Sequence, residues 1–346
     1  MKSSLRPTTI EDLNAVRQFL RRVFNTRDDA PFINPSVMHW KYWDARGDWD
    51  GPRAYVLERD GAIVAHAGIY PVCFESGQVN GIEMIDWASA NDAPGAGLVL
   101  MRKLAAMFDF IYSIGGSDMA HKILPAAGFV EFARQWRGAR PLQPWPLVME
   151  HQYRNWKLAP RLVRNTYWAV YPRTNNRFAS DWQFEEISPS EIGSTKDYEN
   201  VTSTRFSPRP SDFFCYLLRC PVMKMRIYRL TRNLKPAGHF AIGVVRGQAR
   251  LAGVWLHDPN QTAWQAAFSL AHAASLHLEG VREFIAAGTA GTSEQGAVSA
   301  GLRIRTHTPV YLLNKGGNAR LNGEFQFQLA DDDALFMDLG GPNYWT

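Results

Sequence analysis

Cysteine is scarce in this sequence. The chain of 346 residues contains three, Cys73, Cys215 and Cys220, and their spacing is not typical of a disulfide framework or a metal site. His272 and His277 are five residues apart and do not share a helix face well. We therefore expect no metal ion and no disulfide bond.

Long apolar runs are also missing. The stretch "LVLMRKLAAMFDFIYSI" is interrupted by Arg102, Lys103 and Asp109, so it is not expected to span a membrane. The first residues, "MKSSLRPTTIEDL", contain no apolar signal core. Hydrophobic residues make up 46% of the chain and charged residues 21%, as in globular proteins. These features predict a cytoplasmic protein, long enough for two domains.

The first half shows the alternation of helices and strands. A capped helix begins at Thr8 or Thr9, and strands follow near 53–58, 62–72 and 80–89, with a hairpin turn at Asp60-Gly61. Next come a helix at 98–108, the strand "FDFIYSIGG", the helix "SDMAHKILPAAG" with Ser117 as its N-cap, and the strand "FVEFARQWRG".

The second half repeats this order without close residue identity. Three strands, a helix ending at Gly280, a strand, a helix and a strand are predicted between 223 and 314. Between the halves, six prolines at 141–189 indicate a surface linker that carries one helix near 150–166. The predicted domains are thus 1–140 and 201–346, connected by 141–200.

The stretch "NDAPGAGLVLMRKL" places Gly95 and Gly97 between a strand and a helix. A helix that begins near Leu98 leaves its first N–H groups without intrahelical partners, and its dipole attracts anions there. Glycines would keep side chains away from a bound pyrophosphate. The turn therefore favours a phosphate site, although close packing of the helix is the alternative.

Four stretches together resemble the GNAT superfamily of acyl-CoA-dependent N-acyltransferases. They are "LRPTTIEDLNAV", "YVLERDGAIVAHAGIYP", "DWASANDAPGAGLVLMRKL" and "YSIGGSDMAHKILPAAGF", and they span roughly residues 5–135. The resemblance implies two GNAT-like domains of the α/β (α+β) class, each with a mixed, mostly antiparallel sheet flanked by helices. The second copy is expected to be degenerate, because Asp258-Pro259-Asn260 replaces the glycine turn and Thr262 suggests a plain helix cap.

The resemblance also implies the cosubstrate site. Acetyl-CoA, or another acyl-CoA, would bind at these positions: Trp87, Ala88, Ser89, Pro94, Gly95, Ala96, Gly97, Leu98 and Ser117. The chain departs from the family pattern, since Asp92 and Pro94 stand where basic or amide residues are usual. In the family, a tyrosine of the last helix often acts as the general acid. Leu124 stands at that place here, so protonation by this tyrosine does not carry over.

Acyl transfer to an amine uses a general base, and two carboxylates lie on the strand that enters the glycine turn. Glu83 and Asp86 differ in parity along that strand, so we expect only one to face the cleft. The alternative is that both are surface carboxylates. A backbone N–H near Ser89 is expected to hold the oxyanion.

Other candidates have structural alternatives. His121 is read as a partly exposed helix residue, and His66 either faces the cleft or lies in the core. Cys73 is expected to be a buried thiol. The chain has twelve tryptophans, and Trp40 and Trp43 lie on one helix face, where they either pack in the core or form a stacking wall for a sugar.

Positive charge is concentrated in one segment. Nine basic residues and one acid lie between Arg134 and Arg177, mixed with aromatic residues. A solvated linker is one interpretation, and peripheral membrane contact through residues 151–177 is another. Nucleic acid is the least favoured partner, because no recognised binding module accompanies the charge.

These features predict an acetyl-CoA-dependent N-acyltransferase, a transferase of the EC 2.3.1 type. Its acceptor would be an amine of a small molecule or an amino sugar, held between the domains, in polysaccharide biosynthesis or a similar context. One alternative is a Fem-like aminoacyl transferase that uses aminoacyl-tRNA. The other is a non-catalytic GNAT-like binding or scaffold protein.

Overall fold

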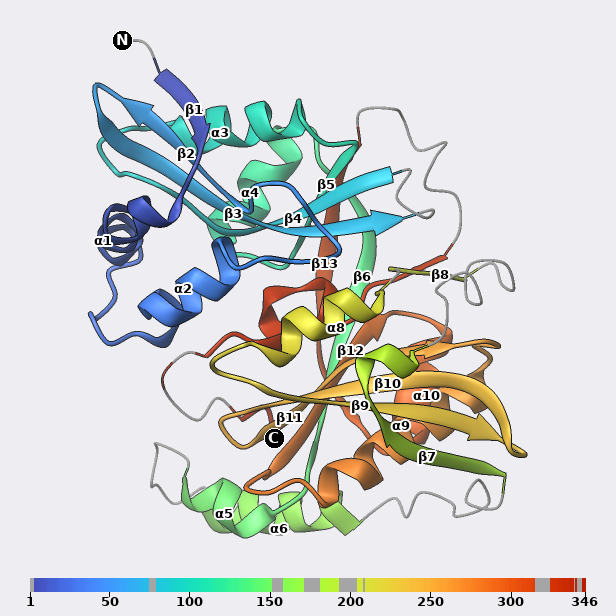
Figure 1. The fold of residues 1–346 in the computed structure, drawn as a ribbon. Helices are drawn as coiled ribbons and strands as arrows, with labels where there is room; N and C mark the ends of the chain where they lie inside the picture. The colour runs from blue at the N-terminus through green and yellow to red at the C-terminus, as the bar shows by residue number, and fades with distance from the viewer. Residues whose placement is uncertain are drawn as a thin grey trace.

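The computed structural model describes residues 3–74, 79–150, 158–170, 181–192, 204–207, 209–314, 324–338, 340 and 344–346. These residues form two halves with the same order of elements, which lie one above the other in Figure 1. The first half contains β1 (Ser3–Pro7), η1 (Ile10–Asp12), α1 (Leu13–Val23), η2 (Pro31–Ile33), α2 (Pro35–Tyr42), β2 (Ala54–Arg59), β3 (Ala62–Phe74), β4 (Val79–Ser89), α3 (Ala96–Ala105), β5 (Phe110–Ile114), α4 (Asp118–Ala126) and β6 (Val130–Pro141).

Local sequence signals account for these elements. Thr9 and Asp12 form a reciprocal capping box before α1, in which the Thr9 amide donates to the Asp12 carboxylate at 2.8 Å. Asp60 and Gly61 both have positive φ, +52° and +79°, as a two-residue hairpin turn between β2 and β3 requires. The predicted helices and strands of this half are confirmed with shifts of a few residues at their ends.

The connection between the halves holds more structure than the sequence predicts. It contains α5 (Pro144–Met149), α6 (Leu158–Val170), β7 (Trp182–Ile187), η5 (Pro189–Glu191) and β8 (Thr204–Phe206), in place of a linker with one helix. β7 pairs antiparallel with β9, and its end residues Trp182 and Ile187 are buried. The proline-rich composition hides this strand because its pairing partner lies about forty residues further along the chain.

The second half follows the predicted order. It contains α8 (Ser211–Leu218), β9 (Lys224–Arg232), β10 (Lys235–Val245), β11 (Gln248–Leu256), α9 (Gln261–Leu276), β12 (Glu283–Thr289), α10 (Thr292–Ser299), β13 (Arg303–Asn314), β14 (Glu324–Gln326), η7 (Leu329–Asp331) and η8 (Asp333–Leu335). Helix α9 packs on α10 and on the sheet, and its alanine-rich face joins a core cluster around Trp136, Trp264 and Phe268.

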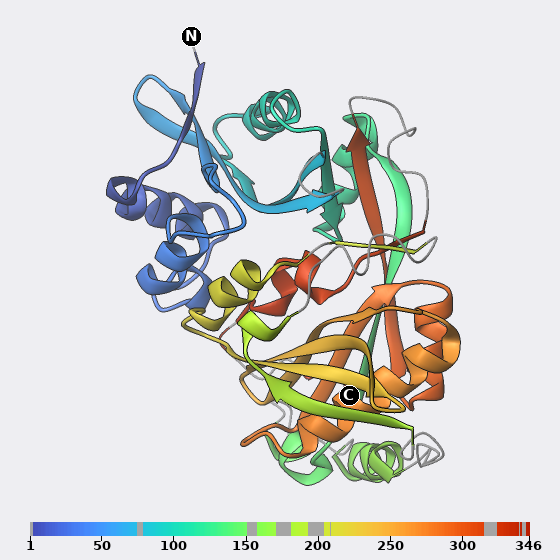
Figure 2. The ribbon, with the colours of Figure 1, turned by 45° about the vertical axis from the view of Figure 1, so that its right-hand side comes forward.

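The two halves share one mixed sheet of twelve strands. Its order is β1-β2-β3-β4-β5-β13-β6-β12-β11-β10-β9-β7. β13, from the second half, lies between β5 and β6 and pairs antiparallel with both. β6, from the first half, pairs antiparallel with β12. Each half therefore contributes one strand, β6 or β13, to the part of the sheet that belongs to the other half. Both strands run through the two halves in Figure 2.

In each half two parallel strands pair briefly and then diverge. β4 and β5 pair at three positions, ending at Glu83 and Tyr112. β11 and β12 also pair at three positions, ending at Arg250 and Ile285. Beyond these points the two strands of each pair are no longer hydrogen-bonded to each other, so the sheet of each half has a wedge-shaped opening.

The C-terminal segment returns to the junction of the halves. Its red helical turns lie between the upper and lower halves in Figures 1 and 2. The Tyr112 hydroxyl donates to the Asp331 carbonyl at 2.8 Å, and the Arg209 guanidinium donates to the Ala330 carbonyl at 2.9 Å. Phe336 packs edge-on against Trp40 from α2, with ring centroids 4.9 Å apart. A core cluster at the junction thus joins α2, α8 and the chain end.

Candidate active site

The opening between β4 and β5 holds a cavity of about 650 Å³. Four parts of the fold line it: β4 beyond the last paired residue, the start of α3, the turn that leads from β5 into α4, and the C-terminal segment. Its lining comprises Phe24, residues 83–89, Gly95, Gly97, Leu98, residues 113–117, Met119, Ala120, Ile123, Arg137, residues 332–334 and Met337.

The start of α3 presents free N–H groups. Gly95, the N-cap, has φ +80°, and a Cβ at this position would meet no heavy atom within 4 Å. Among the residues that the structure describes, the amides of Gly97 and Leu98 donate to no protein acceptor. These amides and the helix dipole together form an anion-binding geometry.

Gly97 has a different role from Gly95. A Cβ at Gly97 would lie 3.2 Å from Trp87 Nε1 and 3.3 Å from Ser89 Cβ. The Trp87 indole donates to the Gly97 carbonyl at 3.1 Å, which ties β4 to α3. The missing side chain of Gly97 thus allows close packing of the helix on the strand, while Gly95 faces open space. The packing alternative for the glycine turn is thus confirmed at Gly97, while the open space at Gly95 leaves room for a phosphate, which stays a prediction.

A second glycine turn lies opposite the first. Gly115 and Gly116 have φ +77° and +118°, and Ser117 caps α4 by accepting from the Ala120 amide at 3.2 Å. Both turns follow the diverging strands and line the same cavity. On two sides of the cavity, the lining therefore includes glycine main chain that carries no side chains.

Most of the predicted cosubstrate residues line this cavity. Trp87, Ala88, Ser89, Gly95, Gly97, Leu98 and Ser117 belong to its lining. Two do not: Ala96 is buried in the core of the first half, and Pro94 is exposed at the surface. Leu124, at the place of the family's tyrosine, is 1% exposed in the same core.

A β-bulge changes the geometry of the two predicted base candidates. Asp86 has φ +47°, and Asp86 and Trp87 of β4 stand opposite the single residue Ala67 of β3. Because the bulge adds a residue, the parity rule fails, and Glu83 and Asp86 line the same cavity. The expectation that only one of them faces the cleft is therefore wrong.

Asp86 is held by α2. Its carboxylate accepts from Lys41 Nζ at 2.5 Å and from the Tyr42 hydroxyl at 2.6 Å. Burial would raise its pKa, but the Lys41 charge and these two hydrogen bonds hold the pKa of Asp86 below its ordinary value. His66 lies beneath the bulge, with Nδ1 3.1 Å from the Asp86 carbonyl oxygen.

Glu83 has the opposite surroundings. The residue is 3% exposed, and its Oε2 has no hydrogen-bond partner among the described residues. Burial, followed by the charges of Asp332 and Asp333, raises the pKa of Glu83 well above its ordinary value. Of the two predicted carboxylates, Glu83 is therefore the stronger base and the one with a free oxygen.

Three aspartates of the C-terminal segment complete the site, and sequence reasoning missed them. Asp331 pairs with Arg209 at 2.6 Å, and Asp332 pairs with Arg137. Asp333 lines the cavity and forms no ion pair with a described residue. The only signal was the run "ADDDA" inside the apolar stretch "FQFQLADDDALFM", which is unusual for a segment without function.

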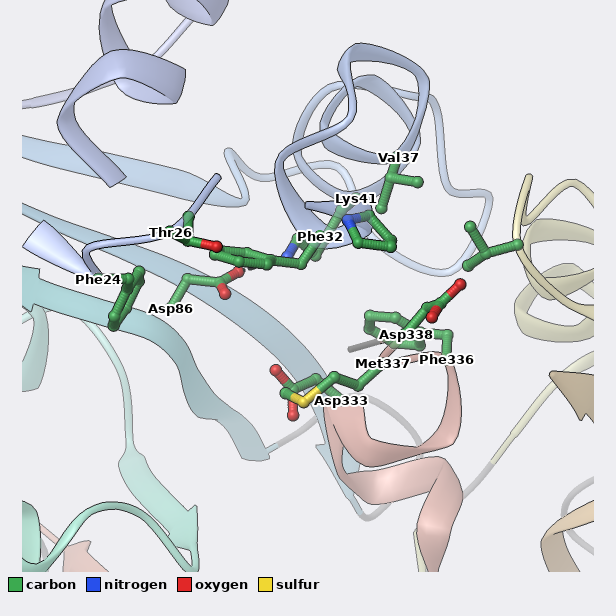
Figure 3. Close-up of a pocket in the computed structure, with 12 residues that line it drawn as sticks. Phe24, Thr26, Phe32, Val37, Lys41, Asp86, Asp333, Phe336, Met337 and Asp338 are labelled. Atoms are coloured by element: carbon green, nitrogen blue, oxygen red, sulfur yellow. Dashed lines mark hydrogen bonds and ion pairs between the residues drawn. The ribbon is translucent and has the colours of Figure 1, made fainter. Parts of the chain in front are cut away.

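A smaller cavity of about 280 Å³ adjoins the first (Figure 3). Phe24, Asp86, Asp333 and Met337 line both cavities, so they mark the junction between them. The remaining wall includes Phe32 and Val37 beside α2 together with Phe336 of the C-terminal segment.

The C-terminal segment of the chain occupies the opening between β11 and β12. Gln328 Oε1 accepts from the Val254 amide at 2.6 Å, and the Phe327 amide donates to Thr289 Oγ1 at 2.8 Å. The following helix, α9, is capped by Asn260, whose side chain accepts from the Ala263 amide at 3.0 Å. The predicted plain cap is therefore present, but at Asn260 and not at Thr262. The second copy is degenerate because its opening is bridged by side chains and its helix has a side-chain cap in place of a glycine turn.

The other candidates lie outside the cavities. His66 is fully buried, and burial lowers its pKa to about 4. His121 is partly exposed, 5.8 Å from Tyr311 between ring centroids. Trp40 is 3% exposed and stacks on Tyr216 at 4.7 Å, so it belongs to the core and not to a sugar-stacking wall. The side chain of Cys73 lies outside the described residues.

The described residues bear on two expectations from the sequence, the lack of a metal site and the lack of a membrane-spanning helix. It contains no cluster of three or more potential metal ligands. None of its helices combines the length and the apolar character that a bilayer crossing requires. In the basic segment, the described α6 places Arg164 over the Trp168 ring at 4.5 Å, while residues 151–157 and 171–177 lie outside the described residues.

The divided parallel strands, the glycine turn into α3 and the repeated order of elements define a tandem GNAT fold. No protein-family model and no curated protein sequence matches the chain. Solved structures do match, and they show the fold. The recognition of two GNAT-like domains in the sequence is therefore confirmed.

Two neighbours illustrate this likeness. A GCN5-related N-acetyltransferase from Anabaena variabilis is 11% identical with a TM-score of 0.55, and the match covers 90% of this chain and 72% of that one. A tandem GNAT protein from the clavulanic acid biosynthesis pathway is 10% identical with a TM-score of 0.53, and the match covers 91% and 99% of the two chains.

Proposed function

We propose that this protein is an acyl-CoA-dependent N-acyltransferase, with acetyl-CoA as the first candidate donor. The observation that carries the proposal is the opening between β4 and β5, where the unpartnered amides of Gly97 and Leu98 face a cavity of about 650 Å³. The unpaired edge of β4 beyond Glu83 offers main-chain groups to a pantetheine arm. The diphosphate would bind at the start of α3.

The reaction requires no covalent enzyme intermediate. The neutral amine attacks the thioester carbonyl carbon, a C–N bond forms, and the C–S bond breaks to release the CoA thiolate, which takes up the proton that the amine has lost and leaves as the thiol. Glu83, whose Oε2 is free and whose pKa is raised, would take the amine proton. A β4 main-chain N–H near Ser89 would stabilise the oxyanion. Asp86, held by Lys41 and Tyr42, would position the strand.

The acceptor is an amine of a small molecule. An amino sugar is supported by the name of one structural neighbour, a fungal glucosamine N-acetyltransferase region that is 11% identical with a TM-score of 0.58. The match covers 90% of this chain and 38% of that one. Within this chain the residue basis for a sugar is weaker, because Trp40 is buried. A cytoplasmic location and membrane contact through residues 151–177 remain predictions.

The donor site can be tested with a charge placed at the first turn of α3. Leu98 is partly exposed and lines the cavity, so Leu98→Glu should repel the diphosphate, while Leu98→Gln keeps the size without the charge. In a thermal-shift titration, acetyl-CoA at 100 times its Kd should stabilise the wild type by about 2.7 kcal/mol. We expect this stabilisation to persist in Leu98→Gln and to be lost in Leu98→Glu.

The alternatives give different results in the same titration. If acetyl-, propionyl- and longer acyl-CoA all fail to stabilise the wild type, the acyl-CoA proposal is wrong, and the aminoacyl-tRNA transferase and the scaffold protein come first. Equal losses in Leu98→Glu and Leu98→Gln would show that Leu98 acts through packing and not through its position near a phosphate.

A further inference from the structure

The smaller cavity has walls of a distinct kind. Its apolar surface comes from both halves of the chain, with Phe24, Phe32 and Val37 around α2 and Phe336 and Met337 at the chain end (Figure 3). The rings of Phe24 and Phe32 meet edge to face at 5.8 Å. Such walls offer few hydrogen bonds, so a polyhydroxylated ligand would leave buried polar groups unpaired there.

The charges around this cavity do not balance. Asp86 is paired with Lys41 at 2.5 Å, and Asp338 is paired with Arg246 at 2.5 Å. Asp333 is the remaining carboxylate of the wall, and it forms no ion pair with a described residue. Burial and the neighbouring Asp332 and Asp86 raise the pKa of Asp333 well above its ordinary value, and the charge of Lys41, which is paired with Asp86, offsets this only in part.

A second carboxyl group without an ion pair among the described residues lies beside Asp333. Glu83 Oε2 is buried without a hydrogen-bond partner in the described structure, and Glu83 interacts electrostatically with Asp333. Asp333 also lies where the smaller cavity meets the cavity between β4 and β5, called the donor cavity after its proposed occupant. A cation at this junction would pair with Asp333 and would lie beside the cavity to which the proposed function assigns the donor.

We propose that the smaller cavity binds acceptors that carry one amine and one compact apolar body, such as an arylalkyl or branched alkyl group. The ammonium group binds Asp333 at the junction, and the apolar body lies among Phe32, Val37 and Phe336. The cavity of about 280 Å³ has room for roughly nine non-hydrogen atoms, if each takes about the volume of a water molecule. This inference rests on the proposed function and names its acceptor class.

The first test compares acceptors. With the purified full chain and saturating acetyl-CoA, product formation is measured by mass spectrometry for 2-phenylethylamine, 3-methylbutylamine, glucosamine and spermidine. We expect kcat/KM for the first two to exceed that for the last two by at least about tenfold, because a buried apolar group contributes on the order of 1.5–3 kcal/mol. A preference for glucosamine or spermidine would overturn the inference.

The second test changes Asp333. Asp333→Asn should raise KM for 2-phenylethylamine at least tenfold, with a smaller change in kcat, and Asp333→Glu should restore part of the affinity. The control is Asp60→Asn in the exposed β2–β3 turn, where asparagine accepts the positive φ of +52°. The stabilisation by acetyl-CoA should be unchanged in all three variants.

A thermal-shift titration with amine alone separates this inference from the proposed function. We expect 2-phenylethylamine to stabilise the wild type, and the uncharged 2-phenylethanol and the Asp333→Asn variant to show a much smaller effect. Binding of acetyl-CoA without any amine stabilisation or apolar preference would overturn the acceptor class alone. Amine stabilisation without acyl-CoA binding would support the cavity assignment and contradict the transferase.

Discussion

Glu83 and Asp86 show how much two identical functional groups can differ within one strand. Both line the donor cavity, yet the pKa of Glu83 is raised and that of Asp86 is lowered. Burial raises the pKa of both carboxyl groups, but at Asp86 the Lys41 charge and two hydrogen bonds outweigh burial, whereas at Glu83 the charges of Asp332 and Asp333 add to it. Under the proposed function, this separation favours Glu83 as the proton acceptor and Asp86 as a positioning residue.

Replacing Glu83 tests this assignment. Glu83→Gln should lower kcat/KM by about 10²- to 10⁴-fold and leave the stabilisation by acetyl-CoA intact, because glutamine fills the same space but cannot accept the proton. In the wild type, kcat/KM should rise with pH through the raised pKa of Glu83, since only the deprotonated form is a base. That limb of the profile should disappear in the variant.

The matched control is Glu279→Gln, at an exposed position before β12. It should leave the rate and the pH profile unchanged. An unaltered pH profile in Glu83→Gln would assign the base to another group.

Among the elements, the C-terminal segment has two functions in one short stretch. Gln328 and Phe327 bridge β11 and β12 in the second opening, and the next residues bring Asp332 and Asp333 to the first one. The opening in the second half is thus occupied by the same segment that lines the candidate active site in the first half. This arrangement explains why the second copy can lose its glycine turn without loss of the fold.

The contribution of the Gln328–Val254 hydrogen bond to stability can be measured with two glutamine-to-methionine substitutions. Gln328→Met keeps the side-chain volume but leaves the buried Val254 amide without its acceptor, so we expect the free energy of unfolding to fall by about 1–3 kcal/mol. Gln326→Met is the control, because Gln326 is also buried and its Oε1 has no partner among the described residues. Urea denaturation measures both.

Equal destabilisation by the two substitutions would contradict the role of the Gln328 hydrogen bond. It would show instead that the segment is sensitive to any change from glutamine to methionine.

At the level of the whole molecule, the exchange of β6 and β13 makes the two halves depend on each other. β13 is the neighbour of β5, and β6 is the neighbour of β12, so neither half has a complete sheet alone. A first half without β13 would expose the edge of β5, and exposed strand edges promote aggregation. Domains that lie apart along the chain are therefore joined in one sheet.

Splitting the chain tests this dependence. Residues 1–150 produced alone should be insoluble or unfolded, because the edge of β5 is unpaired and Tyr112 loses its contact with Asp331. Coproduction with residues 181–346 should restore a soluble heterodimer that acetyl-CoA stabilises, measured by sedimentation and thermal shift. A folded, monomeric first fragment that binds acetyl-CoA would show that the exchanged strand is dispensable.

The local features of this protein follow from short stretches of sequence. The hairpin at Asp60-Gly61, the capping box at Thr9 and the turn into α3 depend on residues a few positions apart, and each is in the predicted place. The same holds for most residues at the start of α3 that line the donor cavity. Such features could be predicted because steric preference and hydrogen bonding act over one or two turns of chain.

Long-range pairing determined the rest. The bulge at Asp86 overturned the parity rule, β13 entered the sheet of the other half, and the aspartates at 331–333 reached β4 across more than two hundred residues of sequence. Nothing near these residues in the chain specifies their partners. Burial of apolar surface and satisfaction of main-chain hydrogen bonds select among many pairings, and only the complete fold shows which one they select.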